Sequence, residues 1–279
     1  MQESEEDLKD IRNSALCAVT VLILMLTFFL GPEPVLAERY YGEDGYGSEE
    51  TGYDLTNHLR EDCWEWDGSF ISYQEEGFTS TVGVDVSKWN GEINWDSLRE
   101  QGVEFAIIRV GFRGYETGDL VLDDRFYEYM DGASAAGLQV GVYFYSQAID
   151  EEEAAEEARF VINNIAGYSV SLPVYFDTEE VRLGESRTDI MATANYTLNA
   201  EAFCRTIEDQ GYRAGVYASN EWIRRNLELS RLMDYEIWYA QYNTTPGRDY
   251  GFDMWQYTAQ GDLYGCDTWL DMNVRVERA

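Results

Sequence analysis

Two acidic residues separated by one position, Asp177 and Glu179, are the first candidates for chemistry in this 279-residue sequence. They end the apolar run LPVYFDTE, which is typical of a buried strand, and a period of two places both carboxyl groups on one side, about 6.6 Å apart along the strand. Two carboxylates on one face repel each other, which raises the pKa of one and keeps a proton available near neutral pH. The pair indicates a general acid and its partner, although a solvated turn explains most isolated Asp-x-Glu pairs.

Two further acidic residues interrupt apolar runs elsewhere in the chain. Asp85 lies within VGVDV, and Asp271 lies within LDMN near the C-terminus. A buried carboxylate needs polar partners, so each residue either caps a turn or belongs to a polar site. Taken together with Asp177 and Glu179, they predict an acidic cluster that is built from three different strands.

The residues that are missing limit the chemistry further. The only histidine, His58, precedes the region that carries the acidic residues, so a Ser-His-Asp triad, a Cys-His pair and a histidine-bearing zinc site are excluded within residues 80–279. The cysteines have no Cys-x-x-Cys spacing, and neither a metal nor a cofactor is expected. One disulfide is possible, for example Cys63 with Cys266, but the sequence does not choose, and Cys204 is expected to be a buried lone cysteine.

The charge of the chain excludes one class of partner. The formal net charge is −33, from 53 acidic and 20 basic residues. A protein that binds nucleic acid must neutralise phosphates with basic side chains, so nucleic acid is not expected as a partner. The acidity is typical of a solvated, soluble surface and does not name a substrate.

The elements that must position the acidic residues alternate between helix and strand beyond residue 81. Gly102, Gly137 and Gly211 each end a helical segment and precede an apolar run, because glycine adopts the left-handed conformation that closes a helix. Asp150 is the predicted N-cap of a helix over residues 151–165. This alternation predicts an α/β domain with parallel strands, and in a barrel of this kind the carboxyl ends of the strands build the active site.

The N-terminal part is expected to lie outside this domain. The uncharged apolar run over residues 15–30 reaches roughly 24 Å, which is marginal for a membrane span. It indicates either a signal peptide cleaved near Ala37 or a retained membrane anchor, and thus an extracytoplasmic protein that is secreted or bound to the cell membrane.

The predicted domains are an N-terminal segment over 1–37, a linker over 38–79 and a barrel over 80–279. The linker is acidic and rich in Gly and Tyr, although Trp64 and Trp66 favour local packing on the domain. A chain that begins near Phe78 is therefore expected to fold and to be active.

A series of motifs makes the interpretation specific. The segments GVDVSKWNGEINW, IIRVGFRGY, GVYFYSQA, LPVYFDTE, GVYAS, IWYAQY, MWQYTAQG and LDMN resemble, in order, those of glycoside hydrolase family 25, the Chalaropsis-type lysozymes. The resemblance spans residues 82–274. It implies a flattened TIM-like barrel of five βα units followed by about three strands, acting as a monomer on peptidoglycan glycan strands. The implied reaction is cleavage of the β-1,4 bond between N-acetylmuramic acid and N-acetylglucosamine.

The same resemblance assigns roles to individual residues. Glu179 is the implied general acid and Asp177 its partner, while Asp85 and Asp271 complete the acidic cluster. Five strand-end residues are the implied lining of the sugar groove, although some are expected to be core: Tyr145, Tyr217, Trp238, Gln241 and Trp255. Cys266 departs from the small or aliphatic residues that are usual before the last strand.

Three questions stay open at this level. A non-catalytic wall-binding module is the alternative from another class, but the chain keeps all four carboxyl groups. A chitinase-like enzyme is a second alternative, although the D-x-x-D-x-D-x-E signature is reduced to its last pair. Asp177 and Glu179 share one strand face and are badly placed to flank the bond, so retention assisted by the N-acetyl group of the substrate is expected instead of a protein nucleophile. It is favoured over inversion, in which Asp85 or Asp271 would activate a water molecule, because N-acetylmuramic acid carries the acetamido group and the Asp-x-Glu pair resembles that of other substrate-assisted families.

Overall fold

The computed structural model describes residues 55–181 and 185–279. These described residues belong to one compact unit. The apolar run over 15–30, the predicted processing site near Ala37 and residues 38–54 of the predicted linker lie outside the described residues. Within the described ranges, no helix has the length and apolar character needed to cross a membrane.

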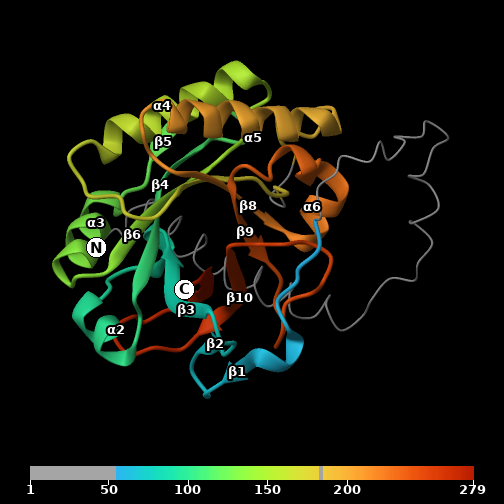
Figure 1. The fold of residues 1–279 in the computed structure, drawn as a ribbon. Helices are drawn as coiled ribbons and strands as arrows, with labels where there is room; N and C mark the ends of the chain where they lie inside the picture. The colour runs from blue at the N-terminus through green and yellow to red at the C-terminus, as the bar shows by residue number, and fades with distance from the viewer. Residues whose placement is uncertain (1–54, 182–184) are drawn as a thin grey trace, which may run out of the picture. The chain divides into compact units, whose positions relative to one another are not determined.

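Eight strands close into a barrel, which Figure 1 shows in a view along its axis. Each neighbouring pair from the first strand to the seventh is parallel, and the last strand runs antiparallel to both of its neighbours, one of which is the first. The strands, in the order in which they neighbour one another, are β3 (Phe78–Val86), β4 (Phe105–Arg113), β6 (Gln139–Tyr145), β7 (Val174–Asp177), β8 (Ala214–Ser219), β9 (Glu236–Ala240), β10 (Met254–Gly261) and β11 (Leu270–Arg278).

Helices follow each of the first five barrel strands. They are α2 (Trp95–Gln101), α3 (Phe126–Ala135), α4 (Glu151–Ile165), α5 (Thr193–Glu208) and α6 (Asn220–Asn226). Smaller elements are β5 (Leu120–Leu122), which pairs with β4, and the 3-10 turns η2 (Glu61–Cys63), η3 (Lys88–Asn90) and η4 (Leu229–Arg231). Five βα units followed by three strands are what the sequence predicted, so the α/β, TIM-like fold class is confirmed.

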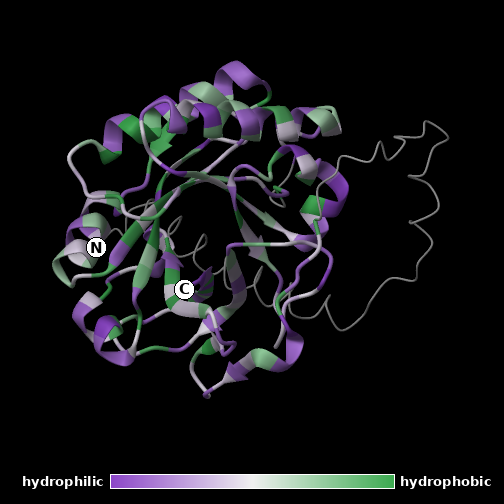
Figure 2. Ribbon diagram, in the orientation of Figure 1, coloured by the Kyte–Doolittle hydropathy of each residue, from purple (hydrophilic) through white to green (hydrophobic). Residues whose placement is uncertain are grey.

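The helix ends form as the sequence indicates. Gly102, Gly137 and Gly211 all have positive φ, at 112°, 77° and 83°. The Asp150 side chain accepts a hydrogen bond from the backbone N–H of Glu153 at 3.0 Å and caps α4. Helix α4 carries both polar and apolar residues in Figure 2, and it buries one apolar face: Ala154, Ala158, Val161 and Ile165.

Side chains alternate between the two faces of the barrel wall, as a period of two requires. The outward-facing apolar residues pack with the helices in the main core. A smaller cluster is formed by Phe105, Ile107, Leu172, Tyr175, Trp238 and Met254, with Tyr143 and Tyr217 packed against it. Residues two apart, such as Tyr175 and Asp177, share a face, so this smaller cluster lies beneath the polar strand ends.

Residues 55–79 differ from the linker prediction. They contain strands β1 (Trp64–Trp66) and β2 (Ile71–Tyr73), which pair antiparallel. Ile71 and Tyr73 are buried, and the ring of Trp64 lies 5.2 Å from that of Trp255 on the barrel. Trp64 thus packs on the barrel as the sequence favoured, whereas Trp66 is 54% exposed. Ile71 and Tyr73 are two residues apart and turn one face of this hairpin toward the core. Cys63, Cys204 and Cys266 are free thiols.

Candidate active site

The four predicted acidic residues meet in one pocket of ≈ 180 Å³. Asp85 comes from β3, Asp177 ends β7, Glu179 follows it, and Asp271 is the second residue of β11. Asp85 and Asp271 are direct partners in the pairing of β3 with β11. The rest of the lining is aromatic or amide-bearing: Tyr143, Tyr217, Trp238, Tyr242 and Gln256. The barrel therefore collects carboxyl groups that are up to 186 positions apart in the sequence.

Two side-chain amides donate hydrogen bonds to Asp85 and hold it in place within the cluster. Asn273 Nδ2 and Gln256 Nε2 donate to Asp85 Oδ2 at 2.7 and 2.8 Å. Trp238 Nε1 in turn donates to Asn273 Oδ1 at 2.8 Å, which fixes the orientation of that amide. Burial raises the pKa of Asp85 to about 6, and these two hydrogen bonds oppose the rise because they stabilise the charged form.

The surroundings of the Asp177 carboxyl group differ from those of Asp85. Its side chain is buried, and its Oδ1 atom has no hydrogen-bond partner among the described residues. Burial raises the pKa of Asp177 well above its usual range, the charges of Glu179 and Asp85 add to the rise, and Arg109 opposes it. The pKa of Asp271 is raised by burial and by the same two neighbours. A cluster of this kind retains a proton at a pH where exposed carboxyl groups have lost theirs.

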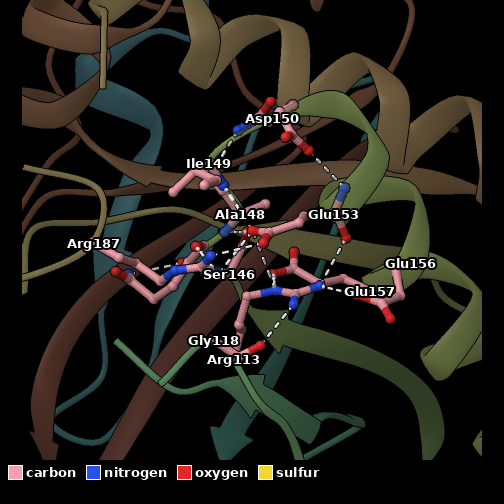
Figure 3. Close-up of polar contacts among 12 residues, drawn as sticks. Arg113, Gly118, Ser146, Ala148, Ile149, Asp150, Glu153, Glu156, Glu157 and Arg187 are labelled. Carbon is pink, nitrogen blue, oxygen red and sulfur yellow. Dashed lines mark hydrogen bonds and ion pairs between the residues drawn. The ribbon is translucent and has the colours of Figure 1, made fainter. Parts of the chain in front are cut away.

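Glu179 lies at the exposed mouth of the pocket, where a substrate has access to it. Further along the chain after Glu179, Arg187 binds to neighbouring elements. Arg187 pairs with both carboxylate oxygens of Glu153 at 2.7 Å, and its backbone N–H donates to the Tyr115 carbonyl at 3.0 Å. Beside it, the buried guanidinium of Arg113 pairs with Glu157 on α4 at 2.8 Å (Figure 3). This network fixes the chain around Arg187 to the frame of the barrel.

The predicted sugar-groove residues divide into three groups. Tyr217 and Trp238 line the pocket. Tyr145 does not line it but is close, since burial and the charges of Glu179 and Asp177 raise its pKa. Gln241 and Trp255 lie elsewhere. Trp255 is fully buried in the core outside the barrel, where its Nε1 donates to the Gln241 carbonyl at 2.7 Å.

Trp255 does not face the pocket because side chains alternate between the two faces of strand β10. Trp255 and Gln256 are neighbours and must face opposite sides, and the structure turns Gln256 toward the pocket. The Gln241 side chain accepts a hydrogen bond from the backbone N–H of Gly247 at 2.7 Å, so it organises the loop after β9 instead.

Four residues of the site were not predicted: Tyr143, Tyr242, Gln256 and Asn273. Two of them share a face with a predicted residue two positions away, Tyr143 with Tyr145 and Asn273 with Asp271. Extending the period of two along β6 and β11 would have found these. Tyr242 follows the end of β9, and only the tertiary structure brings its hydroxyl to Gln256 Oε1, at 3.0 Å.

Comparison with known proteins decides the family. The sequence profile of the Glycosyl hydrolases family 25 matches residues 84–266, a segment that contains Asp85, Asp177 and Glu179. The chain belongs to this family. The matched segment ends before Asp271, which the barrel nevertheless pairs with Asp85.

This family 25 chain is similar in sequence to two proteins named as lysozymes. It is 28% identical over 192 residues to the autolytic lysozyme of Clostridium acetobutylicum, covering 68% of this chain and 54% of the relative. Lysozyme M1 of Streptomyces globisporus is 26% identical over 204 residues, or 68% of this chain and 66% of the relative. The chain thus spans between about half and two thirds of the length of these relatives.

Solved structures share the fold of the family 25 domain. The bacterial lysozyme from Streptomyces coelicolor superposes with a TM-score of 0.60 at 24% identity, covering 69% of this chain and 90% of that chain. The modular autolysin LytC from Streptococcus pneumoniae, in complex with a synthetic peptidoglycan ligand, has a TM-score of 0.62 at 22% identity, covering 76% and 51%.

The residues of the family 25 site do not form a metal centre. In residues 55–181 and 185–279, no three His, Cys, Asp or Glu side chains are arranged to hold a metal ion. What the arrangement can do is acid–base chemistry, since it combines an accessible carboxyl group at the mouth with buried carboxyl groups of raised pKa below it.

The burial of Asp177 leads to a prediction about stability and pH. A carboxyl group whose pKa is higher in the folded than in the unfolded state takes up a proton on folding. Its stabilising contribution is therefore complete below its unfolded pKa of about 4 and is lost as the pH rises through the folded value. Asp177→Asn removes the buried charge, so we expect its free energy of unfolding at pH 8 to exceed that of the wild type by about 1 kcal/mol or more.

Thermal unfolding of both proteins at pH 4 and pH 8 tests this. The gain is expected at pH 8 and should shrink at pH 4, where the wild-type carboxyl group is protonated as well. Asp262→Asn, at an exposed position, is the matched control and should show no pH-dependent difference. A destabilised Asp177→Asn protein at pH 8 would mean that Asp177 is ionised and well solvated.

Proposed function

We propose that the chain is a peptidoglycan hydrolase of the muramidase type, which cleaves the β-1,4 bond between N-acetylmuramic acid and N-acetylglucosamine. The observation that carries the proposal is the buried Asp177 Oδ1 atom, which has no hydrogen-bond partner among the described residues and belongs to a residue that lines the pocket together with Glu179. A buried acceptor of this kind costs free energy unless a bound molecule supplies a donor. The acetamido N–H of an N-acetylated sugar is such a donor.

The relatives support the substrate class. Two of them are named lysozymes, and one protein with the same fold was solved with a synthetic peptidoglycan ligand. Peptidoglycan glycan strands are therefore the proposed partner, and the site of action is proposed to lie outside the cytoplasm. The apolar run over residues 15–30 is the proposed export element, either cleaved as a signal peptide or retained as a membrane anchor.

The proposed roles follow from the position of each side chain. Glu179, at the accessible mouth, protonates the oxygen of the leaving sugar. Asp177, next to it and buried, accepts the acetamido N–H and orients the acetamido oxygen for attack on the anomeric carbon. Asp85, whose charged form is stabilised by two amide donors, supplies negative charge that stabilises an oxocarbenium-like transition state, and Asp271 beside it completes the acidic cluster. Tyr217 and Trp238 contact the sugar, and Tyr145 borders the site.

Digestion of purified cell walls by the full-length protein tests the proposal. Mass spectrometry of the released fragments should locate the new reducing end on N-acetylmuramic acid. A new reducing end on N-acetylglucosamine would contradict the proposed bond. Cleavage of soluble chitooligosaccharides, with intact walls left unchanged, would instead favour an enzyme that acts on chitin. A protein that sediments with walls without reducing their turbidity would be a binding module.

We further propose that hydrolysis proceeds with retention of configuration and uses the acetamido group of the substrate as the nucleophile. Ordinary retaining enzymes place two carboxyl groups about 5 to 5.5 Å apart on opposite sides of the bond, whereas Asp177 and Glu179 lie two residues apart at the end of one strand. Proton NMR of the first product should show the β-anomer before mutarotation. An initial α-anomer would indicate inversion, with Asp85 or Asp271 activating a water molecule.

A further inference from the structure

The crossing from β9 to β10 differs from the others in the barrel. The described residues contain no helix between these two parallel strands, and residues 241–253 form an irregular loop whose Tyr250 and Phe252 pack against the main core. Phe252 of this loop stacks on Tyr239 of β9, with ring centroids 5.7 Å apart and planes 9° apart. An irregular loop has few internal hydrogen bonds, so its backbone polar groups need partners from another part of the chain.

The partners come from residues 55–60, which we name the strap. The Leu55 carbonyl accepts a hydrogen bond from the Gly251 N–H at 2.6 Å, and the backbone N–H of Asn57 donates to the Arg248 carbonyl at 3.2 Å. The Asn57 side chain is 5% exposed, and its Nδ2 donates to the Gly247 carbonyl at 2.9 Å. The strap therefore supplies hydrogen-bond partners to backbone groups of the loop at three positions, where other crossings of the barrel carry a helix.

The same loop carries part of the pocket wall. The backbone N–H of Gly247 donates to Gln241 Oε1 at 2.7 Å, which ties the strap-bound part of the loop to its first residue. The next residue, Tyr242, lines the pocket and shares a hydrogen bond of 3.0 Å with Gln256 Oε1. Gln256 in turn donates to Asp85 at 2.8 Å. A continuous series of contacts thus runs from Asn57 to the acidic cluster.

We infer that Asn57 is a positioning residue for the pocket wall formed by Tyr242, and that the strap is a working part of the enzyme although it precedes the family match, which begins at residue 84. The inference rests on the proposed function for its readout. Tyr242 is 53% exposed and stands on a loop without secondary structure, so its place at the pocket depends on what holds the loop.

The test uses full-length variants and compares kcat and KM on soluble glycan strands. Asn57→Asp keeps the oxygen that accepts from the Leu59 N–H, at 3.0 Å, but removes the donor to Gly247. Asn57→Ala is the second variant, in case the first does not fold. The loss of one buried hydrogen bond is expected to lower kcat/KM about 10-fold, mainly through KM, because a misplaced wall weakens substrate binding.

Asp67→Ala is the matched control. Asp67 caps a turn in the same N-terminal segment, accepting from the Ser69 and Phe70 N–H groups at 2.8 and 2.7 Å, and contacts no residue of the loop in these hydrogen bonds. Its loss is expected to change stability but not the KM of the folded protein. A change in KM as large as that of the Asn57 variants would overturn the inference.

A double-mutant cycle with Tyr242→Ala, which removes the whole wall, separates positioning from general loosening. If Asn57 acts through Tyr242, the double variant should be no worse than about 2-fold below Tyr242→Ala alone. Fully additive losses, or unchanged kcat/KM in both Asn57 variants, would overturn the inference.

Amide hydrogen exchange gives a readout that does not depend on activity. Residues 241–252 should exchange faster in the Asn57 variants than in the wild type, and unchanged exchange would contradict docking by the strap. A wild-type protein that releases no wall fragments would contradict the proposed function, while the exchange measurement would still decide whether the strap holds the loop.

Discussion

Glu179→Gln is expected to lower the turnover of glycan cleavage by at least about 100-fold, because the loss of a positioned general acid costs that much or more. Glutamine has nearly the same shape as glutamate but has no proton to give to the leaving oxygen. Glu179 lies at the exposed mouth of the pocket, so its replacement should leave the thermal unfolding midpoint close to that of the wild type.

Release of soluble fragments from purified walls, measured together with circular dichroism, checks this expectation. Glu180→Gln is the matched control, since it is the next residue, is also exposed and does not line the pocket. It should retain wild-type turnover. A folded Glu179→Gln protein that lyses walls at near the wild-type rate would remove Glu179 from the acid role and leave one of the buried aspartic acids as the proton donor.

Removal of residues 1–77 is expected to lower the thermal unfolding midpoint by more than about 10 °C. Ile71 and Tyr73 are buried, and Trp64 packs on Trp255, so their loss uncovers apolar surface on the barrel. At about 1.5 to 3 kcal/mol for each large side chain, three of them contribute at most roughly 4.5 to 9 kcal/mol, which is comparable to the whole stability of a domain. The linker interpretation predicts instead that this shortened chain folds and is active, so the two views predict different outcomes.

Calorimetry of two shortened chains decides between these views. A chain that begins at Leu55 keeps the strap and the β1–β2 hairpin, and it should unfold at about the temperature of the full-length protein. A chain that begins at Phe78 lacks both and should unfold much earlier or aggregate. Equal unfolding midpoints for the two chains would show that the hairpin does not stabilise the barrel and would support a domain boundary near residue 80.

The fold was predictable because its signals are local and repeated. Gly102, Gly137 and Gly211 mark helix ends by a backbone conformation that other residues disfavour, and Asp150 marks a helix start through its own side chain. Each of these signals is contained in a few consecutive residues. The hairpin of residues 64–73 lacked such a signal, since two strands of three residues each are too short to show a period above an acidic, Gly-rich background.

The sequence by itself determined which residues can do the chemistry: with the one histidine outside the barrel, carboxyl groups or tyrosines were left, and the period of two predicted that Asp177 and Glu179 lie on one face. The tertiary structure alone decided the environment of each carboxyl group. Asp85 receives two amide donors, whereas Asp177 is buried with one oxygen that has no partner among the described residues. The physical reason is that a pKa depends on burial and on neighbouring charges, and those neighbours come from strands far apart in the chain.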